Sequence, residues 1–351
     1  MSSTPEQRAM KAAAGLYHAY FTGLILTLVT RRSAHDAAAW VFRTFRHQHH
    51  EKFLASFDKL GLRGLPDAVA CAAYHYLSNS VGGVTVEFMR ESDRKAWVNF
   101  VPPRWIYPGA SICGVPSEVS RAFLHGWYAH NGVSLGNPRL GFVCTAQTTD
   151  GQHGLSGYFL EYDRELAPEE RLQFRPGELP PPFDPAAAPR LPEAWTPGRL
   201  ARAERNYAME YIRSGLPRLA EIFGPAEAAH LGRVTGRLVG AQLYRETAAL
   251  LGVEAGGASG FAQFMVALAG GEGDAATAEA DGANVIVTRT GWRLTRDLGA
   301  LSPAVFEGWN GLLEGAIAVH DRFLLLETIA RLDLGDPATV WRIRRRPSAA
   351  G

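Results

Sequence analysis

One stretch near the middle of the chain has a weaker copy close to its C-terminus. Residues 123–162 show the pattern of an aromatic helix end, a Gly/Asn/Pro turn, a strand, a tight turn and a closing strand. Residues 306–346 repeat this order, and aligning Gly126-Trp127 with Gly308-Trp309 keeps the later turns in register after short insertions. The repeat predicts an internal duplication in which only the first copy kept its chemically interesting side chains.

The repeat also predicts how the chain divides. The run PPPFDPAAAPRLP between the copies is one that neither a helix interior nor a central strand tolerates. We therefore predict a first domain over residues 1–165 with the active pocket, a Pro-rich linker over 166–196, and a degenerate second copy over 197–351. Each half shows helices, a hairpin, one helix and a last hairpin. This order predicts an α+β fold of two tandem related domains, each an antiparallel sheet covered by helices.

Composition narrows the classes of function. The chain is 46% hydrophobic and 20% charged, as in soluble globular proteins, and its net charge of +1 predicts neither nucleic acid nor membrane as partner. Cys71, Cys113 and Cys144 are too few and too irregularly spaced for a disulfide scaffold, which indicates a reducing cytoplasm. The apolar run 23–29 is shorter than the roughly 20 residues that span a bilayer, so we predict no membrane anchor. A homodimer is left open.

The densest polar cluster is the helical run RHQHHE at residues 46–51. His47 shares a helix face with His50 or Glu51, as metal ligation or an acid/base pair would require. A solvated helix face explains the same pattern. A divalent metal, Zn or Fe, would need a further ligand from His75, His130 or Cys144, and the absence of an HExxH motif gives no support for a standard zinc hydrolase. Otherwise no cofactor is expected.

Two thiols are candidate nucleophiles, because a thiolate activated by a nearby imidazole attacks readily. Cys113 precedes a helix N-terminus, which favours anions, and we rank it first for reactivity. Cys144 lies in a strand and faces the helices, where a small buried hydrophobe is the alternative interpretation. In this scheme His130 or His50 relays protons.

The helix that leads into the Asn137 turn ends in an aromatic and polar set that copy two lacks. A guanidinium can grip a carboxylate bidentately, which makes Arg104 and Arg139 candidates, and Trp105, Tyr107 or Trp127 could stack on a flat ring, although packing in the core explains these aromatic residues too. The predicted substrate-binding residues are Arg104, Tyr107, Trp127, Tyr128, Asn131, Asn137 and Arg139.

Short motifs give the first half a family resemblance. They are Leu60-Gly61-Leu62, Asp93-Arg94, Asn137-Pro138-Arg139-Leu140 and Thr149-Asp150-Gly151. With these motifs, residues 40–162 resemble the L-2-amino-thiazoline-4-carboxylic acid hydrolase-like family, which is related in layout to the 4-vinyl-reductase-type small-molecule-binding domains. The resemblance implies a hydrolase-like pocket for a small cyclic or heteroaromatic molecule.

These observations lead to one expected function and two rivals. We expect a hydrolase-like enzyme that acts, with thiol or histidine assistance, on a small cyclic or heteroaromatic substrate containing C–N or C–S bonds. The first rival is a non-catalytic protein that binds or senses a small molecule. The second is a metal-dependent enzyme built on His47, His50 and Glu51.

Overall fold

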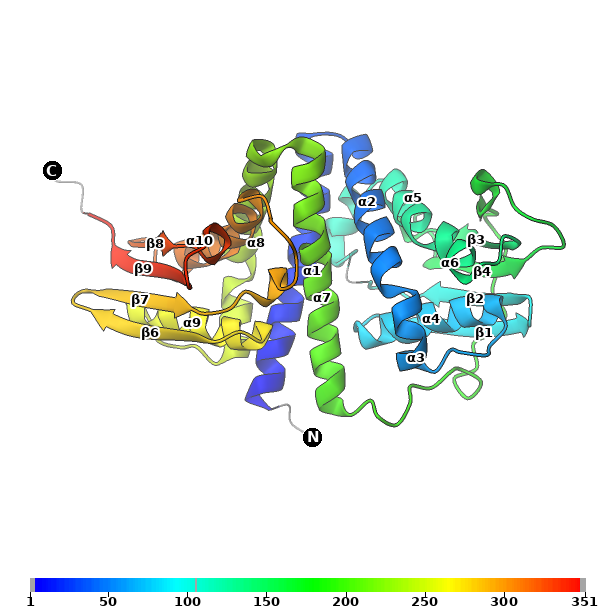
Figure 1. Cartoon of the computed structure of the whole chain (residues 1–351), viewed down its shortest axis with the longest axis horizontal. Coiled ribbons are helices and arrows are strands. Elements are labelled where there is room, and N and C mark those ends of the chain that lie inside the picture. The colour runs from blue at the N-terminus through cyan, green and yellow to red at the C-terminus, as the bar shows by residue number, and fades with distance from the viewer. Residues whose placement is uncertain (1–3, 105, 348–351) are drawn as a thin grey trace. The chain divides into compact units, whose positions relative to one another are not determined.

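The computed structural model describes residues 4–104 and 106–347. It shows an α+β protein with two largely antiparallel sheets, each covered by helices (Figure 1). The chain forms two compact units: unit 1 comprises residues 1–27 and 201–351, and unit 2 comprises residues 28–200. These bounds differ from the predicted domains, because the first 27 residues group with the C-terminal part of the chain.

Unit 2 is a five-stranded sheet with helices on one face. Its strand order is β1-β2-β4-β3-β5, in which β5 runs parallel to β3 and all other neighbours are antiparallel. In chain order its helices and strands are α2 (Ala34–Lys52), α3 (Phe57–Leu60), α4 (Asp67–Val81), β1 (Val86–Ser92), β2 (Lys95–Phe100), α5 (Ser117–Gly126), α6 (Asn131–Leu135), β3 (Leu140–Ala146), β4 (Leu155–Glu161) and β5 (Leu172–Phe174).

Local sequence explains the helical layer of unit 2. Ser33 caps α2 by accepting a hydrogen bond from the Asp36 backbone N–H at 3.0 Å. α5 packs closely against α2, because Gly126 has no side chain where a Cβ would lie 2.7 Å from the Phe42 carbonyl oxygen. α4 lies directly on strands β1, β2 and β4.

The opposite face of this sheet is covered by chain that the sequence predicted as linker. Met89, Trp97, Val143 and Tyr158 form an apolar cluster on this face, and Leu160 and Phe183 pack against it. Phe183 comes from the predicted linker, and β5, which lies within the same linker, pairs with the edge of β3. The segment is therefore part of the folded unit.

Unit 1 contains a four-stranded antiparallel sheet with the order β6-β7-β9-β8. Unit 2 has the same order in its first four strands, β1-β2-β4-β3. This agrees with the repeated plan of elements, whereas a common origin of the halves stays a prediction. The elements of unit 1 are α1 (Pro5–Arg31) as far as residue 27, α7 (Pro197–Phe223) from residue 201, α8 (Pro225–Leu251), α9 (Gly257–Glu272), β6 (Ala276–Asp281), β7 (Asn284–Arg289), α10 (Ala304–His320), β8 (Leu324–Ala330) and β9 (Thr339–Arg345).

Helix α1 is long and apolar enough to cross a membrane, with 27 residues instead of the short apolar run considered in the sequence. However, 67% of its most apolar window is buried inside the protein. The Tyr20 hydroxyl donates to the carbonyls of Gly232 and Gly308, at 3.0 and 2.6 Å. α1 is therefore a core helix of unit 1.

Helices α8 and α10 of unit 1 touch almost backbone to backbone. Their contact is a row of glycines from each helix, and added Cβ atoms would collide with the facing backbone. A Cβ on Gly240 would lie 2.0 Å from the Leu312 oxygen, and one on Gly315 would lie 2.0 Å from the Arg237 oxygen. The absence of side chains allows the close approach that places Trp309 in the core.

We predict that Gly240→Ala lowers the free energy of unfolding by about 2 kcal/mol or more, because the added methyl must push the two helices apart. The matched control is Gly15→Ala in α1, where no atom lies within 4 Å of the added Cβ. There the better helix propensity of alanine should stabilise by about 0.5–1 kcal/mol. Urea unfolding measures both values, and equal effects of the two substitutions would contradict the packing.

Candidate functional site

A continuous chain of hydrogen bonds crosses the interior of unit 2. It begins at Arg46 of α2, whose Nη1 lies 2.9 Å from His49 Nδ1. His49 Nε2 lies 3.1 Å from Asn131 Oδ1, and Asn131 Nδ2 lies 3.0 Å from His75 Nε2. His49, Asn131 and His75 are all buried. Three helices, α2, α6 and α4, thus meet at one polar chain within an otherwise apolar core.

Arg46 determines which group donates and which accepts in each of these hydrogen bonds. A guanidinium can only donate, so His49 Nδ1 accepts and the ring hydrogen of a neutral His49 lies on Nε2. That N–H donates to Asn131 Oδ1, and the Asn131 amide in turn donates to His75 Nε2. The opposite amide orientation would require both nitrogens of His49 to accept, which a neutral imidazole cannot do. Arg46 therefore fixes both tautomers.

Burial keeps both imidazoles neutral. It lowers the pKa of His49 to about 3, and the nearby charges of Arg46 and His130 lower this pKa further. The pKa of His75 is also well below its usual value, because the ring is buried and lies near His49 and Arg104. At physiological pH the two imidazoles are thus neutral, and the hydrogen bonds from Arg46 to His75 run in one direction.

Aromatic rings enclose the inner end of the chain. The His75 ring stacks on Tyr128 with 3.9 Å between centroids and is parallel to Phe159 at 5.5 Å. Trp127 meets His49 edge-on at 5.5 Å. These contacts hold the imidazoles in place and exclude water from around them.

Arg104 lies in the same interior and has an unusual environment. Only 3% of the residue is exposed, and its Cζ lies 4.5 Å from the Phe100 ring centre and 4.8 Å from that of Phe123. Its Nε and Nη1 are buried and have no hydrogen-bond partner within residues 4–104 and 106–347. Its charge contributes to the low pKa of His75. Such a group requires an explanation, because buried polar atoms are nearly always paired.

Unit 1 contains a buried arginine that has partners within the protein. Arg289 Nη2 lies 2.5 Å from carboxylate oxygens of both Glu272 and Asp274. The Tyr17 hydroxyl donates to Glu272 at 3.0 Å and accepts from the Trp309 indole N–H at 2.9 Å. Burial raises the pKa of Glu272, although Arg289 opposes this shift. The charge of Arg289 is thus paired with carboxylates of the same unit.

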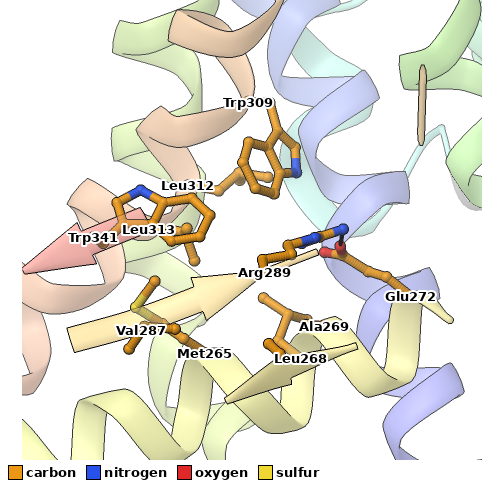
Figure 2. A pocket seen from close by; sticks show the side chains of 11 residues that line it. Met265, Leu268, Ala269, Glu272, Val287, Arg289, Trp309, Leu312, Leu313 and Trp341 are labelled. Atoms are coloured by element: carbon orange, nitrogen blue, oxygen red, sulfur yellow. Dashed lines mark ion pairs between the residues drawn. The ribbon is translucent and has the colours of Figure 1, made fainter. Parts of the chain in front are cut away.

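A small hollow adjoins this ion pair, and Figure 2 shows Arg289 and Glu272 at one end of its apolar lining. Its walls include Leu268, Leu312, Leu313 and Trp341. The cavity has a volume of about 10 Å³, which is the space of a single water molecule. In this conformation the hollow is too small for an organic ligand.

The structure gathers most of the predicted binding residues inside unit 2. Tyr128 and Asn131 are buried there, and Trp127 contacts His49. The Tyr107 hydroxyl lies 3.4 Å from Ser120 Oγ and faces the same interior, as the effect of the Arg104 charge on its pKa shows. Trp105 lies outside the described residues.

Other predicted residues lie elsewhere. Arg139 is exposed and forms an ion pair with Glu161 at 2.6 Å. The Asn137 amide donates to Asp67 at 2.8 Å and to Glu161 at 3.2 Å. These two residues belong to a surface network and do not face the buried chain.

The two thiols lie in different surroundings. Cys144 is buried, its Sγ lies 3.5 Å from the Ala146 carbonyl oxygen, and burial raises its pKa to about 12, so it stays protonated. Cys113 is exposed in the turn Gly109–Gly114 before α5. Across residues 4–104 and 106–347, no histidine is hydrogen-bonded to either thiol. The arrangement does not assemble a thiol and its base.

The predicted metal ligands lie on the outer side of α2. His47 Nε2 lies 3.4 Å from Glu51 Oε1, and both side chains are partly exposed, while His50 is exposed. In the part of the chain that the structure describes, no group of three or more His, Cys, Asp or Glu side chains is arranged to hold a metal ion. Nothing in this geometry favours the metal-dependent alternative.

The half-buried His130 has the properties of a neutral base. Its Nδ1 lies 3.0 Å from the His125 carbonyl and must donate to it, so Nε2 carries the lone pair. Burial and Arg46 lower its pKa, and its ring centre lies 6.2 Å from that of His49. His130 therefore lies next to the outer part of the hydrogen-bond chain.

Sequence reasoning missed His49, which links Arg46 to Asn131. A signal was present, because His49 continues the buried stripe of α2 that includes Val41 and Phe45. His75 was considered only as an additional metal ligand. The partners of both histidines come from distant parts of the chain.

Comparison with protein-family models gives no match, and neither the curated proteins nor the solved structures give one. The resemblance to the thiazoline hydrolase-like family therefore stays a prediction.

The neutral histidines predict how stability depends on pH. The unfolded chain protonates an imidazole near pH 6.5, whereas folded His49 accepts the proton only near pH 3. The stability contribution is therefore complete above pH 6.5 and is lost as pH falls towards 3. We expect His49→Gln to reduce the slope of unfolding free energy against pH by up to about 1.4 kcal/mol per pH unit between about pH 6 and 4.5.

Urea unfolding at a series of pH values measures this slope. The matched control is His153→Gln, because His153 is exposed to solvent and its removal should leave the slope as in the unchanged protein. An unchanged slope in His49→Gln would mean that the histidine is not held neutral.

The paired arginine of unit 1 gives a prediction on stability alone. Arg289→Met leaves Glu272 and Asp274 buried without their cation and should destabilise by about 3–5 kcal/mol near neutral pH. Arg218→Met, which removes a surface pair with Glu221, should cost less than about 1 kcal/mol. Denaturant unfolding compares them, and similar losses would contradict the role of the buried ion pair.

Proposed function

We propose that this protein binds a small anionic molecule in the interior of unit 2, with Arg104 as the charged contact, and that it acts as a binding or sensing protein without chemistry of its own. The observation that supports this proposal is the buried guanidinium with unpaired Nε and Nη1. The two N–H groups point in different directions, and each can donate a charge-assisted hydrogen bond to an oxygen of a bound anion.

The free-energy cost of an unpaired buried charge favours a ligand-binding role for Arg104 over a structural one. A charge left buried without its partner typically costs about 3–5 kcal/mol, a large part of the stability of a folded domain. Contacts with Phe100 and Phe123 offset a fraction of this, about 0.5–2 kcal/mol for a cation over an aromatic ring. Arg289 in unit 1 has two carboxylates, so the chain does supply partners where a buried arginine serves structure. For Arg104 the ligand would supply them.

The surroundings suggest the chemical class of the ligand. The pKa shifts keep His49 and His75 neutral and raise the pKa of Cys144, so Arg104 is the deeply buried cation of this interior, whereas Arg46, at the outer end of the hydrogen-bond chain, is partly exposed to solvent. One buried positive charge is balanced by one negative charge. Together with the surrounding aromatic rings, this favours a flat molecule with a single carboxylate. The free cysteines are compatible with a cytoplasmic location.

A hydrolase is the second candidate, and the neutral His130 is the observation that favours it. Its lone pair on Nε2 could accept a proton from a water molecule beside the buried chain. A thiol mechanism has less support, because the pKa of Cys144 is raised to about 12 and only the thiolate attacks. In this alternative Arg104 would hold the substrate carboxylate.

Arg104→Met tests the binding proposal. With benzoate as the test ligand, we expect the melting temperature of the unchanged protein to rise with benzoate concentration, by the equivalent of about 2.7 kcal/mol at a hundredfold excess over Kd. Arg104→Met should abolish this rise. Without ligand its stability should not fall, because methionine replaces a charge that has no partner. Differential scanning fluorimetry and calorimetry provide both readings.

Two controls make this experiment decisive. Arg121→Met removes an exposed arginine that lies over Phe174 in the same unit, and should leave the response to benzoate intact. Benzamide has the same ring without the charge and should not stabilise the protein. If Arg104→Met still responds to benzoate, or if it unfolds without ligand as readily as Arg289→Met, the proposal is wrong. Hydrolysis of benzamide to benzoate and ammonia, with water supplying the new C–O bond, would favour the hydrolase.

A further inference from the structure

Positive charge gathers at the outer end of the hydrogen-bond chain in unit 2. Arg46 of α2 is partly exposed, and its hydrogen bond to His49 uses only one of its N–H groups. The ring centre of His49 lies 6.2 Å from that of His130, which is also partly exposed. The Arg46 guanidinium and the His130 ring therefore lie close together at the surface of unit 2.

The charged groups that act on His130 are all basic. Burial lowers the pKa of His130, and Arg46, Arg171 and His125 lower it further. Burial and the charge of Arg121 in turn lower the pKa of His125. In the part of the chain that the structure describes, no carboxylate opposes these effects on either imidazole. This side of unit 2 therefore holds basic groups without a counter-charge of its own.

Arg171 comes from the segment before β5 and lies against the start of β3. Its carbonyl oxygen accepts a hydrogen bond from the Phe142 N–H at 2.8 Å. α6, which follows His130 directly, packs on the same part of β3, because a Cβ added to Gly132 would lie 2.6 Å from the Leu140 carbonyl oxygen. The start of β3 thus holds Arg171 beside the turn that carries His130.

The side chain of Arg171 lacks an acceptor. Its Nε is buried and has no hydrogen-bond partner among the described residues. Buried N–H groups are nearly always paired, so an unpaired one requires an explanation. Arg63, by contrast, is an arginine of the same unit that pairs with Asp58 at 2.7 Å. An oxygen of a bound anion can supply the acceptor that Arg171 lacks.

We propose that Arg46, His130 and Arg171 form a surface site for a tetrahedral oxyanion with two negative charges, of which phosphate is the biological example. Guanidinium groups pair well with phosphate oxygens, and this site supplies two of them. Free phosphate and the phosphoryl group of a small molecule share this chemistry. The site is separate from Arg104, whose single buried charge matches a single carboxylate.

Binding should place one proton on His130. Its Nδ1 donates to the His125 carbonyl, so Nε2 of the neutral ring holds a lone pair and cannot donate to an anion. A nearby negative charge favours the imidazolium and raises the pKa of His130. Nε2 then takes up a proton from solvent and donates it in a hydrogen bond to the anion. Affinity therefore increases as pH falls through the pKa of bound His130, and levels off below the pKa of the free ring.

Calorimetric titration of the full chain with sulfate tests the site, because sulfate stays doubly charged over the pH range used. Chloride holds the ionic strength constant, which separates binding from general screening. We expect one sulfate per chain, and a Kd at least about tenfold weaker in Arg171→Met, which loses a charge-assisted hydrogen bond. Arg63→Met removes an exposed arginine that is already paired with Asp58, and should leave the Kd unchanged. Circular dichroism verifies that each variant is folded.

The pH dependence gives a second reading, which does not require Arg171→Met to fold. The Kd of the unchanged protein for sulfate should fall between about pH 7.5 and 6, by up to about tenfold per pH unit. In His130→Gln this dependence should disappear, because the group that takes up the proton is gone. His153→Gln, which removes an exposed imidazole of the same unit, should retain it.

Cross-tests separate this site from the proposed ligand site. Arg104→Met should bind sulfate like the unchanged protein, and Arg171→Met should still respond to benzoate. Phenyl phosphate and inorganic phosphate then identify the source of the anion: tighter binding of phenyl phosphate indicates a phosphorylated small molecule, and equal or weaker binding indicates free phosphate. The inference is overturned if sulfate does not bind saturably, if Arg104→Met abolishes its binding, or if neither Arg171→Met nor His130→Gln changes it.

Discussion

A guanidinium group taken out of water needs acceptors for its N–H groups, and this requirement dominates the interior of unit 2. Arg104 follows the end of β2 and is held between Phe100 of that strand and Phe123 of α5. The rings cover its faces, where a cation interacts favourably with the aromatic π system, but leave its edge without acceptors. The hydrogen-bond chain from Arg46 to His75 adds no negative charge. Nε and Nη1 of Arg104 therefore remain without an acceptor among the residues that the structure describes.

The two units share one order of helices and strands, and a small difference in sequence decides whether the buried arginine has a carboxylate partner. Both have a helix, a hairpin, a helix and a second hairpin in the same strand order. The helix before the hairpin ends at Glu272 in unit 1, where the carboxylate meets Arg289. In unit 2 the corresponding helix ends at Val81, which has no charge. One interior is thus balanced by its own residues, and the other retains an unpaired positive charge.

The sequence predicted local features well because they depend on neighbouring residues. Periodicity and turn residues gave the order of helices and hairpins, and the comparison of the copies directed attention to Tyr128, His130 and Asn131. The run RHQHHE did not reveal that His49 points inward, because this depends on the phase of α2 against α5. Arg139 was predicted to face a pocket, but its partner Glu161 lies on a different strand.

Sequence patterns could not predict contacts between residues that are distant in the chain. Tyr17 bonds to Glu272 across most of the chain length, which explains why the first 27 residues belong to unit 1. The Pro-rich segment looked like a linker, and only the apolar cluster under Phe183 shows that it covers the sheet. In the same way, the sequence could not show that Nε and Nη1 of Arg104 have no hydrogen-bond partner among the described residues.

The most direct test of the central claim is a high-resolution crystal structure of the full chain grown with benzoate. We predict that a carboxylate oxygen of benzoate lies within hydrogen-bond distance of Nε or Nη1 of Arg104, with the benzoate ring among the aromatic side chains of unit 2. A structure in which a carboxylate of the protein itself pairs with Arg104, or in which Arg104 extends into solvent, would contradict the account.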